Sequence, residues 1–340
     1  MTTYRFRQID TNGKRTDFYG DITGSGVVGE TRNHGIIGST NITIFRGLMS
    51  GSWWPSVNTS TVPDVRTVYT FEKTNITPVG AGRTRYFIPA WPAQSDFVGH
   101  GPTASLPTPY PSASIADRIF GITHAMDFRP AVEPMNDETE QRYTILVSGQ
   151  DEVGPSCQFA QQIALSRSNA EIVICPCPKG GTTSTEWLPA SGVASFFGAA
   201  ANRTLNSLYM VYGTPQPVIP FWWFEQAPSN GSTSSLASQW AADMTTIANE
   251  IETIFADWLI VRPMRILFSR VQTDLPSGFN FLQTDWDALI ANQESWQASN
   301  RVMCIKSNGN LNADNQHQNT TGQIIHGQRA AEAVLSASFI

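Results

Sequence analysis

The sequence predicts an α/β protein: a three-layer α/β/α sandwich around a parallel five-stranded sheet, flavodoxin-like, preceded by a small β-rich domain. Two observations predict this. From Asp117 to the C-terminus, short apolar runs alternate with segments of helical period, which is typical of a parallel sheet covered on both faces. Before that point, apolar and Thr-rich runs are broken at short intervals by Gly, Asn, Asp and Pro, which is typical of short antiparallel strands.

The N-terminal part, residues 1–110, is expected to form the β-rich domain and to serve attachment or assembly. A segment rich in proline follows at 101–116, where prolines at 102, 107, 109 and 111 oppose a helix and favour extended chain. We therefore expect a domain boundary there. The second domain then covers residues 111–340.

The second domain is expected to alternate strands and helices. The predicted strands are 118–123, 172–177, 218–224, 265–271 and 301–306. The predicted helices are 155–168, 194–212, 235–258, 285–298 and 320–338. The third helix shows the clearest period, with one apolar stripe at Leu236, Trp240, Met244, Ile247, Ile251 and Phe255.

The composition excludes several classes of protein. Only 15% of the 340 residues are charged and the net charge is -6, which argues against binding to a nucleic-acid backbone. No stretch approaches the ~18 apolar residues of a membrane span, and the polar start at 1–8 has no apolar run behind it, so we expect neither a membrane protein nor a secretory signal. The four cysteines, Cys157, Cys175, Cys177 and Cys304, lack the spacing of a metal site and are expected to be buried free thiols. We expect no metal and no cofactor.

Asp314 and His317 are the first candidates for chemistry, because they lie three residues apart on a loop that leads into the last helix. A carboxylate at that spacing can orient the imidazole, which makes two thirds of a nucleophile-activating triad. In a parallel sheet the ligand site lies beyond the carboxyl ends of the strands. The loops 123–127, 178–183, 225–230 and 314–317 are therefore expected to converge at one edge.

The order of these motifs resembles that of the SGNH hydrolases, specifically the carbohydrate esterases related to sialate O-acetylesterase. That family has a Gly-Gln-Ser-Asn nucleophile turn, a Gly-Pro before a helix, a Gly-Gly-Thr turn followed by Trp, a Trp-x-Gln-Gly-Glu-x-Asn turn and a final Asp-x-x-His. The matching residues are Gly154, Pro155, Phe159, Ala160, Lys179, Gly180, Gly181, Thr182, Trp187, Phe224, Glu225, Gln226, Asn230, Asp314 and His317. Ala227 and Pro228 depart from the family's Gly and Glu. The resemblance covers about residues 117–340.

The nucleophile position departs most from the pattern, and three registers are open. In the first, Thr123, His124 and Ala125 stand for Gly-Gln-Ser, so that alanine occupies the nucleophile position. In the second, a shift by two residues makes Thr123 the nucleophile. The third starts at Gly149 and runs into Gly154 without the usual loop. An alanine has no lone pair to attack an ester, so the first register, which we favour, leaves either a serine replaced by alanine or a fold kept for binding or structure.

The resemblance also implies roles for the remaining residues. His317 is expected to act as the base and Asp314 to hold its tautomer, while Gly180, Gly181 and Asn230 supply oxyanion donors. Unobstructed backbone N–H groups are the reason a Gly-Gly turn suits that task. His124, Thr182 and Gln226 are expected to contact the substrate, an O-acetylated carbohydrate or polysaccharide.

A second hypothesis concerns the setting of the chain. Low charge, abundant Ser, Thr, Asn and Gly, and a β-rich region ahead of an esterase-like one are typical of a phage tail spike or fibre, a homotrimer in the virion. Such a spike would deacetylate host polysaccharide and contact other virion proteins. The alternatives are a non-catalytic virion protein that binds carbohydrate, and a free bacterial esterase, cytoplasmic or exported by a non-classical route.

Overall fold

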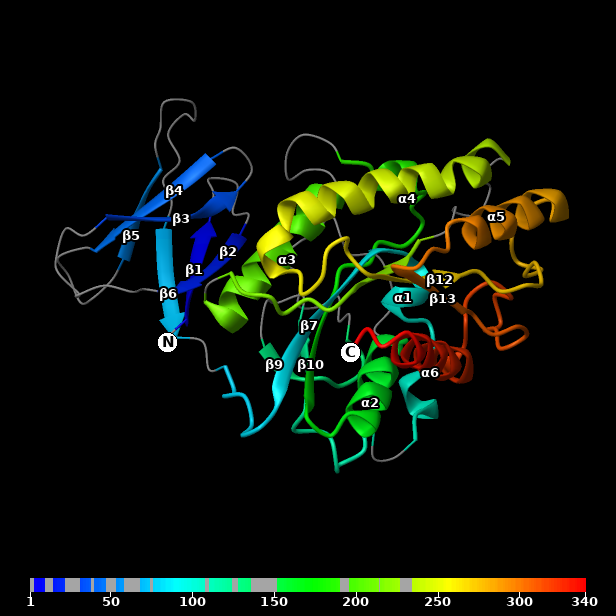
Figure 1. Ribbon diagram of the computed structural model, residues 1–340, viewed down its shortest axis with the longest axis horizontal. Helices are drawn as coiled ribbons and strands as arrows, with labels where there is room; N and C mark the ends of the chain where they lie inside the picture. Colours follow the sequence, from blue (N-terminus) through cyan, green and yellow to red (C-terminus); the bar gives the residue numbers. More distant parts are fainter. Residues whose placement is uncertain are drawn as a thin grey trace.

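A seven-stranded sheet forms the centre of the protein, in a computed structural model that describes residues 3–9, 15–21, 31–37, 40–46, 53–57, 68–73, 76–107, 110–123, 128–135, 152–189, 196–213, 215–226 and 234–340. The strand order is β13-β12-β11-β7-β10-β8-β9, and every pair is parallel except β8 with β9. The strands are β7 (Thr84–Ala93), β8 (Ile119–Ile122), β9 (Phe128–Pro130), β10 (Ala170–Pro176), β11 (Trp222–Glu225), β12 (Ile266–Arg270) and β13 (Arg301–Ile305). The predicted α/β fold class is confirmed, with seven strands in place of the five expected (Figure 1).

Strand β7 is the main difference from the sequence prediction. It lies in the middle of the sheet between β11 and β10, although it precedes the boundary predicted near residue 110. Residues on both sides of that boundary therefore pair in one sheet. The strand contains Pro89 and Pro92, and proline in a sequence argues against a central strand because it cannot donate to the ladder. Tertiary pairing overrides that signal here: Pro89 lies opposite Cys175 of β10.

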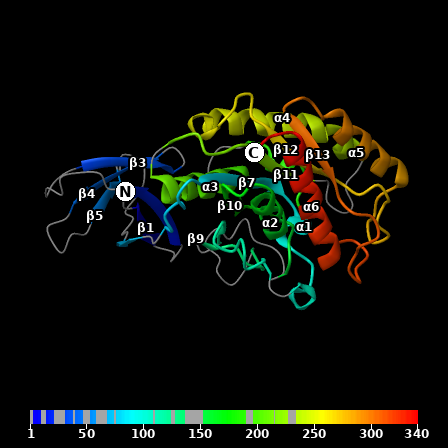
Figure 2. The same ribbon diagram turned by 60° about the horizontal axis from the view of Figure 1, so that its bottom comes forward.

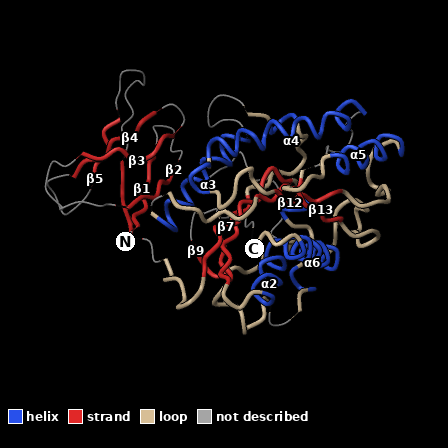
Figure 3. Tube along the Cα trace, in the orientation of Figure 1, coloured by secondary structure: helices blue, strands red, loops and turns tan. Residues whose placement is uncertain are grey.

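Helices cover both faces of the sheet, as the alternating pattern predicted. The helices are α1 (Ser95–Val98), α2 (Ser156–Ser166), α3 (Phe196–Tyr212), α4 (Ser234–Ile254), α5 (Gln283–Ser295) and α6 (Thr320–Ser336). Figures 1 and 3 show α3, α4 and α5 on one side of the sheet and α2 and α6 on the other. The five long helices lie where the sequence predicted helical period.

The side chains of β7 pack into two hydrophobic cores, one on each face of the sheet. Phe87 and Trp91 join the cluster under α3, α4 and α5, whereas Ile88 and Ala90 join the cluster under α2 and α6. This follows from the alternation of side chains along a strand. Burial on both faces makes β7 a central part of the α/β unit.

Six further strands lie before the central sheet in sequence, and they agree with the expected β-rich character. They are β1 (Thr3–Ile9), β2 (Arg15–Asp21), β3 (Thr31–Ile37), β4 (Thr40–Arg46), β5 (Trp53–Val57) and β6 (Val68–Lys73). They form two antiparallel three-stranded sheets, β2-β1-β6 and β3-β4-β5. Figure 2 shows them beside α3, which β1 and β2 contact. Within the described residues, no helix has the length and hydropathy needed to cross a membrane.

Candidate active site

Ser95 lies at the carboxyl end of the central strand. β7 ends at Ala93, Gln94 is extended (φ -113°, ψ -165°), and α1 begins at Ser95. The Lys179 N–H donates to the Ala93 carbonyl at 2.9 Å, which brings the loop after β10 to the same edge. A sharp turn between a buried parallel strand and a helix is where open α/β sheets place their ligand sites.

The imidazole of His317 links this serine to a carboxylate. Its Nε2 lies 2.9 Å from Ser95 Oγ, and its Nδ1 lies 2.6 Å from Asp314 Oδ2. The other carboxylate oxygen of Asp314 accepts the N–H groups of Gln316 at 2.9 Å and His317 at 3.1 Å. Burial opposes the charge on Asp314, but these hydrogen bonds, first that of the His317 side chain, lower its pKa. The predicted contact between Asp314 and His317 is thus present, together with a hydroxyl that the sequence analysis did not assign.

A second histidine stacks on the ring of His317. The ring centroids of His100 and His317 are 3.7 Å apart and the planes differ by 5°. Burial lowers the pKa of His100 to about 4, and the nearby charge of His317 acts in the same direction. His100 is therefore neutral at physiological pH.

These two histidines and Asp314 each offer a ligand atom within 4.8 Å of the others, so the cluster must be tested as a metal site. An imidazole nitrogen binds a metal in the plane of its ring. Parallel stacked rings hold their lone pairs in separate planes, so those of His100 and His317 do not converge on one ion. Both ring nitrogens of His317 also face other partners, Asp314 and Ser95. The geometry suits proton transfer better than metal binding.

The loop after β10 contains the predicted Gly180, Gly181 and Thr182. The Thr182 carbonyl accepts the side-chain amides of Gln94 and, at 2.8 Å, of Gln226. Gly181 has a φ of +71°, a conformation that favours glycine, and its backbone faces open space where a Cβ would lie. Thr182 and Gln226 are both buried, so the structure uses them to hold the Gly-Gly turn beside Gln94.

Of the other predicted site residues, Thr123 is the one that the structure describes, and it lies elsewhere. Thr123 is buried just after β8, and β10 separates β8 from β7 in the sheet. His124, Ala125 and Asn230 lie outside the described residues. The structure thus brings Gly180, Gly181, Thr182, Gln226, Asp314 and His317 to one edge.

Ser95 is the residue that sequence reasoning missed, although a signal was present. Ala93-Gln94-Ser95-Asp96 differs at its first and last positions from the Gly-Gln-Ser-Asn turn. It also follows a strand with two prolines that was assigned to the N-terminal domain. A search for Gln-Ser alone after any apolar run would have found it.

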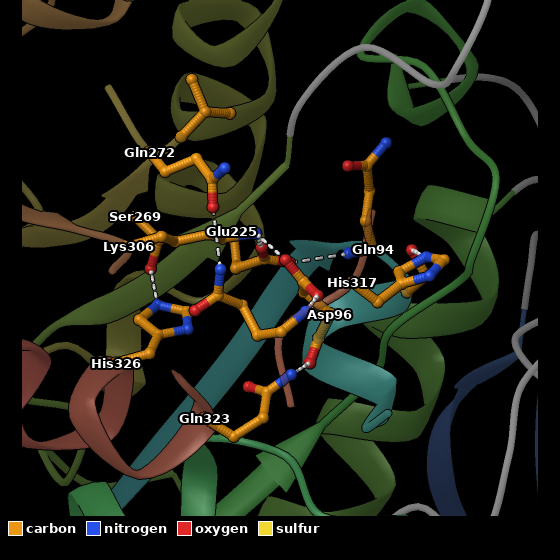
Figure 4. A network of polar contacts seen from close by, with 12 residues as sticks. Gln94, Asp96, Glu225, Ser269, Gln272, Lys306, His317, Gln323 and His326 are labelled. Carbon is orange, nitrogen blue, oxygen red and sulfur yellow. Dashed lines mark hydrogen bonds and ion pairs between the residues drawn. The ribbon is translucent and has the colours of Figure 1, made fainter. Parts of the chain in front are cut away.

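A buried cluster of charged side chains contacts the residues that flank Ser95. Lys306 Nζ is 2.9 Å from Asp96 Oδ2 and forms a second ion pair with Glu225 (Figure 4). Burial opposes the charge on Asp96, but Lys306 and His317 outweigh it and lower its pKa to about 2. Burial raises the pKa of Glu225, and the two carboxylates raise that of Lys306 against the effect of burial.

A cavity of about 30 Å³ opens beside Ser95 and His317. Val271, Phe279 and Trp286 line its apolar part. Val271 and Phe279 come from the loop between β12 and α5, and Trp286 comes from α5. That loop is tied to the His317 loop because the Gly278 N–H donates to the Asn315 carbonyl at 3.0 Å. A space of this size holds about one water molecule or one methyl group.

Comparison with known families agrees with this arrangement. Residues 91–336, well over half of the chain, match the family described as carbohydrate esterase, sialic acid-specific acetylesterase. The chain belongs to this family. The match begins within β7 and so includes Ser95 as well as His317. A search of curated protein sequences found no match.

Solved structures show the same fold. A protein from Arabidopsis thaliana is 20% identical with a TM-score of 0.58, covering 75% of this chain and 98% of its own. The structure titled NanS is 15% identical with a TM-score of 0.52, covering 77% of this chain and 98% of its own. At these identities the likeness concerns the fold alone.

Proposed function

We propose that this protein is a serine-type carbohydrate O-acetylesterase whose nucleophile is Ser95. The observation that carries the proposal is the chain of contacts Ser95 Oγ to His317 Nε2 at 2.9 Å and His317 Nδ1 to Asp314 at 2.6 Å. A hydroxyl, an imidazole and a carboxylate in this order form an activated nucleophile. Membership of the acetylesterase family supports the acetyl group and the carbohydrate as substrate class.

In the first half of the reaction, Ser95 Oγ attacks the acetyl carbonyl carbon while its proton passes to His317 Nε2. Asp314 keeps the proton on Nδ1 and stabilises the imidazolium that forms. The tetrahedral intermediate then collapses. Its bond to the sugar oxygen breaks, that oxygen takes the proton from His317, and the acetyl group remains on Ser95.

In the second half, a water molecule takes the place of the sugar. His317 accepts one of its protons as the oxygen attacks the acetyl carbon, and then returns that proton to Ser95 as the acyl–oxygen bond breaks. The product leaves as acetic acid, which ionises to acetate in water. The negative oxygen of both intermediates needs fixed donors. We assign this role to the backbone N–H groups of Ser95 and of the Gly180–Gly181 turn, and the predicted donation by the Asn230 side chain stays a prediction.

This assignment replaces the nucleophile positions considered from the sequence. With Ser95 as nucleophile, alanine at position 125 does not make the chain inactive. Thr123 is set aside because it follows β8, a strand separated from β7 by β10. The proposed enzyme is therefore active as it stands.

The test compares two hydroxyl deletions, Ser95→Ala and Thr123→Ala, on p-nitrophenyl acetate and on an O-acetylated sugar. We expect Ser95→Ala to remove hydrolysis and Thr123→Ala to keep it. A fluorophosphonate should label the wild type on the peptide that contains Ser95, as mass spectrometry would show. Retained hydrolysis in Ser95→Ala would refute the proposal.

A role within a phage tail spike is a separate proposal about the setting of the enzyme. It is supported by the composition and by six β-strands that precede β7 outside the central sheet. Light scattering on the purified chain tests it. A stable trimer favours the spike, and a monomer favours a free esterase.

A further inference from the structure

We infer that the buried ion cluster of Asp96, Lys306 and Glu225 positions Ser95 and His317 for the reaction. This inference rests on the proposed function and adds three positioning residues to it. None of the three is expected to touch the reacting atoms. They act by holding the nucleophile turn and the base loop in one geometry.

The cluster holds the nucleophile turn from both sides of Ser95. Before the serine, the Gln94 N–H donates to Glu225 Oε2 at 3.1 Å. After it, the carboxylate of Asp96 pairs with Lys306. Since Lys306 also pairs with Glu225, one ammonium group joins the two carboxylates that fix the residues flanking Ser95.

The same carboxylate reaches the base loop. Asp96 Oδ1 accepts the N–H of Gln318, the residue after His317, at 2.9 Å. The Asp96 carbonyl accepts the side-chain amide of Gln323 at 2.8 Å, which ties α1 to α6. Asp96 therefore connects the nucleophile and the base, which are 222 residues apart in sequence. Figure 4 shows this network between β7, β11 and α6.

The charges of the cluster also face the imidazole. The imidazole of His317 faces the carboxylate of Asp96, which lies on α1, and that of Asp314, which lies on the same loop as His317. It also faces neutral His100 in the loop after α1. Lys306 pairs with Asp96. Asp96, whose pKa is lowered to about 2, brings a negative charge to the imidazole of His317. A negative charge beside the ring stabilises the imidazolium that forms during the reaction.

A buried ion pair elsewhere in the sheet provides a matched control. Arg85 and Glu171 pair at 2.7 Å near the opposite end of β7, and both side chains are buried. Converting Glu171 to glutamine makes the same chemical change as Asp96→Asn, a buried carboxylate to an amide beside a cation. Because the Arg85–Glu171 pair lies near the opposite end of β7 from Ser95, Glu171→Gln can alter stability but not the geometry of the reacting groups.

The experiment compares Asp96→Asn, Glu225→Gln and Glu171→Gln in the full chain. An asparagine can still accept the Gln318 N–H, so Asp96→Asn tests the charge and the ion pair. We expect kcat on p-nitrophenyl acetate to fall by about 10²-fold in Asp96→Asn, because small misplacements of reacting groups cost that much. KM should change little, and the acid limb of kcat/KM should move to lower pH. Glu225→Gln should show a smaller fall, and Glu171→Gln none.

The outcomes separate this inference from the proposed function. A wild-type chain that neither hydrolyses acetyl esters nor is labelled by a fluorophosphonate would refute the esterase proposal itself. An active wild type with equal kcat and equal pH profiles in Asp96→Asn and Glu171→Gln would overturn only the inference. Should Asp96→Asn fail to fold, Glu225→Gln decides, because it keeps the Lys306–Asp96 pair: an unchanged fluorophosphonate labelling rate would then overturn the inference.

Discussion

The described residues include two serine–histidine pairs with nearly the same Oγ–Nε2 distance and very different surroundings. Ser95 Oγ lies 2.9 Å from His317 Nε2, and Ser269 Oγ lies 2.7 Å from His326 Nε2. The second pair connects β12 to α6 inside the core, where Ser269 is 3% and His326 0% exposed. The Trp223 indole N–H donates to Ser269 Oγ at 2.9 Å.

The comparison teaches that a short distance does not make a nucleophile. Among the described residues, Nδ1 of His326 has no hydrogen-bond partner, whereas Nδ1 of His317 faces Asp314. Burial lowers the pKa of His326 to about 3, so this imidazole resists protonation. Ser95 follows a strand end beside a cavity, while Ser269 lies within a strand. Access and an orienting carboxylate distinguish the two pairs.

The largest expected effect comes from replacing the histidine of the Ser95–His317 pair, and the matching change in the buried pair is its comparison. His317→Ala should lower kcat by about 10⁶-fold, as loss of a triad base does, with little change in the free energy of unfolding. His326→Ala should keep most of the activity and lower the free energy of unfolding by roughly 2–4 kcal/mol, because it leaves a buried cavity. An acetyl-ester assay measures kcat of both variants, and urea unfolding measures their free energy of unfolding. A catalytic loss in His326→Ala at full stability would reverse the roles.

Removing the charge of the orienting carboxylate should have the next largest effect. Asp314→Asn leaves the ring position almost unchanged but no longer fixes the tautomer, so kcat should fall by about 10⁴-fold. The loss should be smaller than in His317→Ala. Activity near that of the wild type would mean that Asp314 only caps the turn through the N–H groups of Gln316 and His317.

The pH dependence of stability should report the buried pair. The folded pKa of His326, about 3, lies below its ordinary value of 6.5, so the unfolded chain binds the extra proton between these values. Stability is therefore full above pH 6.5 and falls with decreasing pH, by about 1.4 kcal/mol per pH unit for this one group. His100 contributes with the same sign down to about pH 4. His326→Gln should make the slope between pH 6.5 and 4 shallower, and an unchanged slope would contradict the prediction.

The smallest effect is expected for the serine of the buried pair. Ser269→Ala removes an acceptor for the Trp223 indole and a partner for His326, which should cost about 1–3 kcal/mol of unfolding free energy. Activity should stay within a few-fold of the wild type, unlike that of Ser95→Ala. Thermal unfolding and the acetyl-ester assay on the same preparation check both parts. A null effect on stability would show that the indole finds another partner.

Local pattern was enough to predict much of the α/β unit. The five long helices and strands β8, β10, β12 and β13 follow from apolar period, which depends only on neighbours in the chain. The contact between Asp314 and His317 was predicted for the same reason, since three residues on a turn bring carboxylate and imidazole together. Contacts between residues that are close in the chain can therefore be predicted from the sequence alone.

Tertiary structure decided the rest. β7 carries two prolines that a local rule assigns to an edge, yet pairing with β10 and β11 and burial on both faces hold it at the centre of the sheet. That placement brings Ser95 to His317 across 222 residues and sets Lys306 between Asp96 and Glu225. The sequence by itself determined the fold class and the base loop. The identity of the serine beside the base was decided by strand order, because pairing between distant strands depends on the whole core and leaves no local period to read.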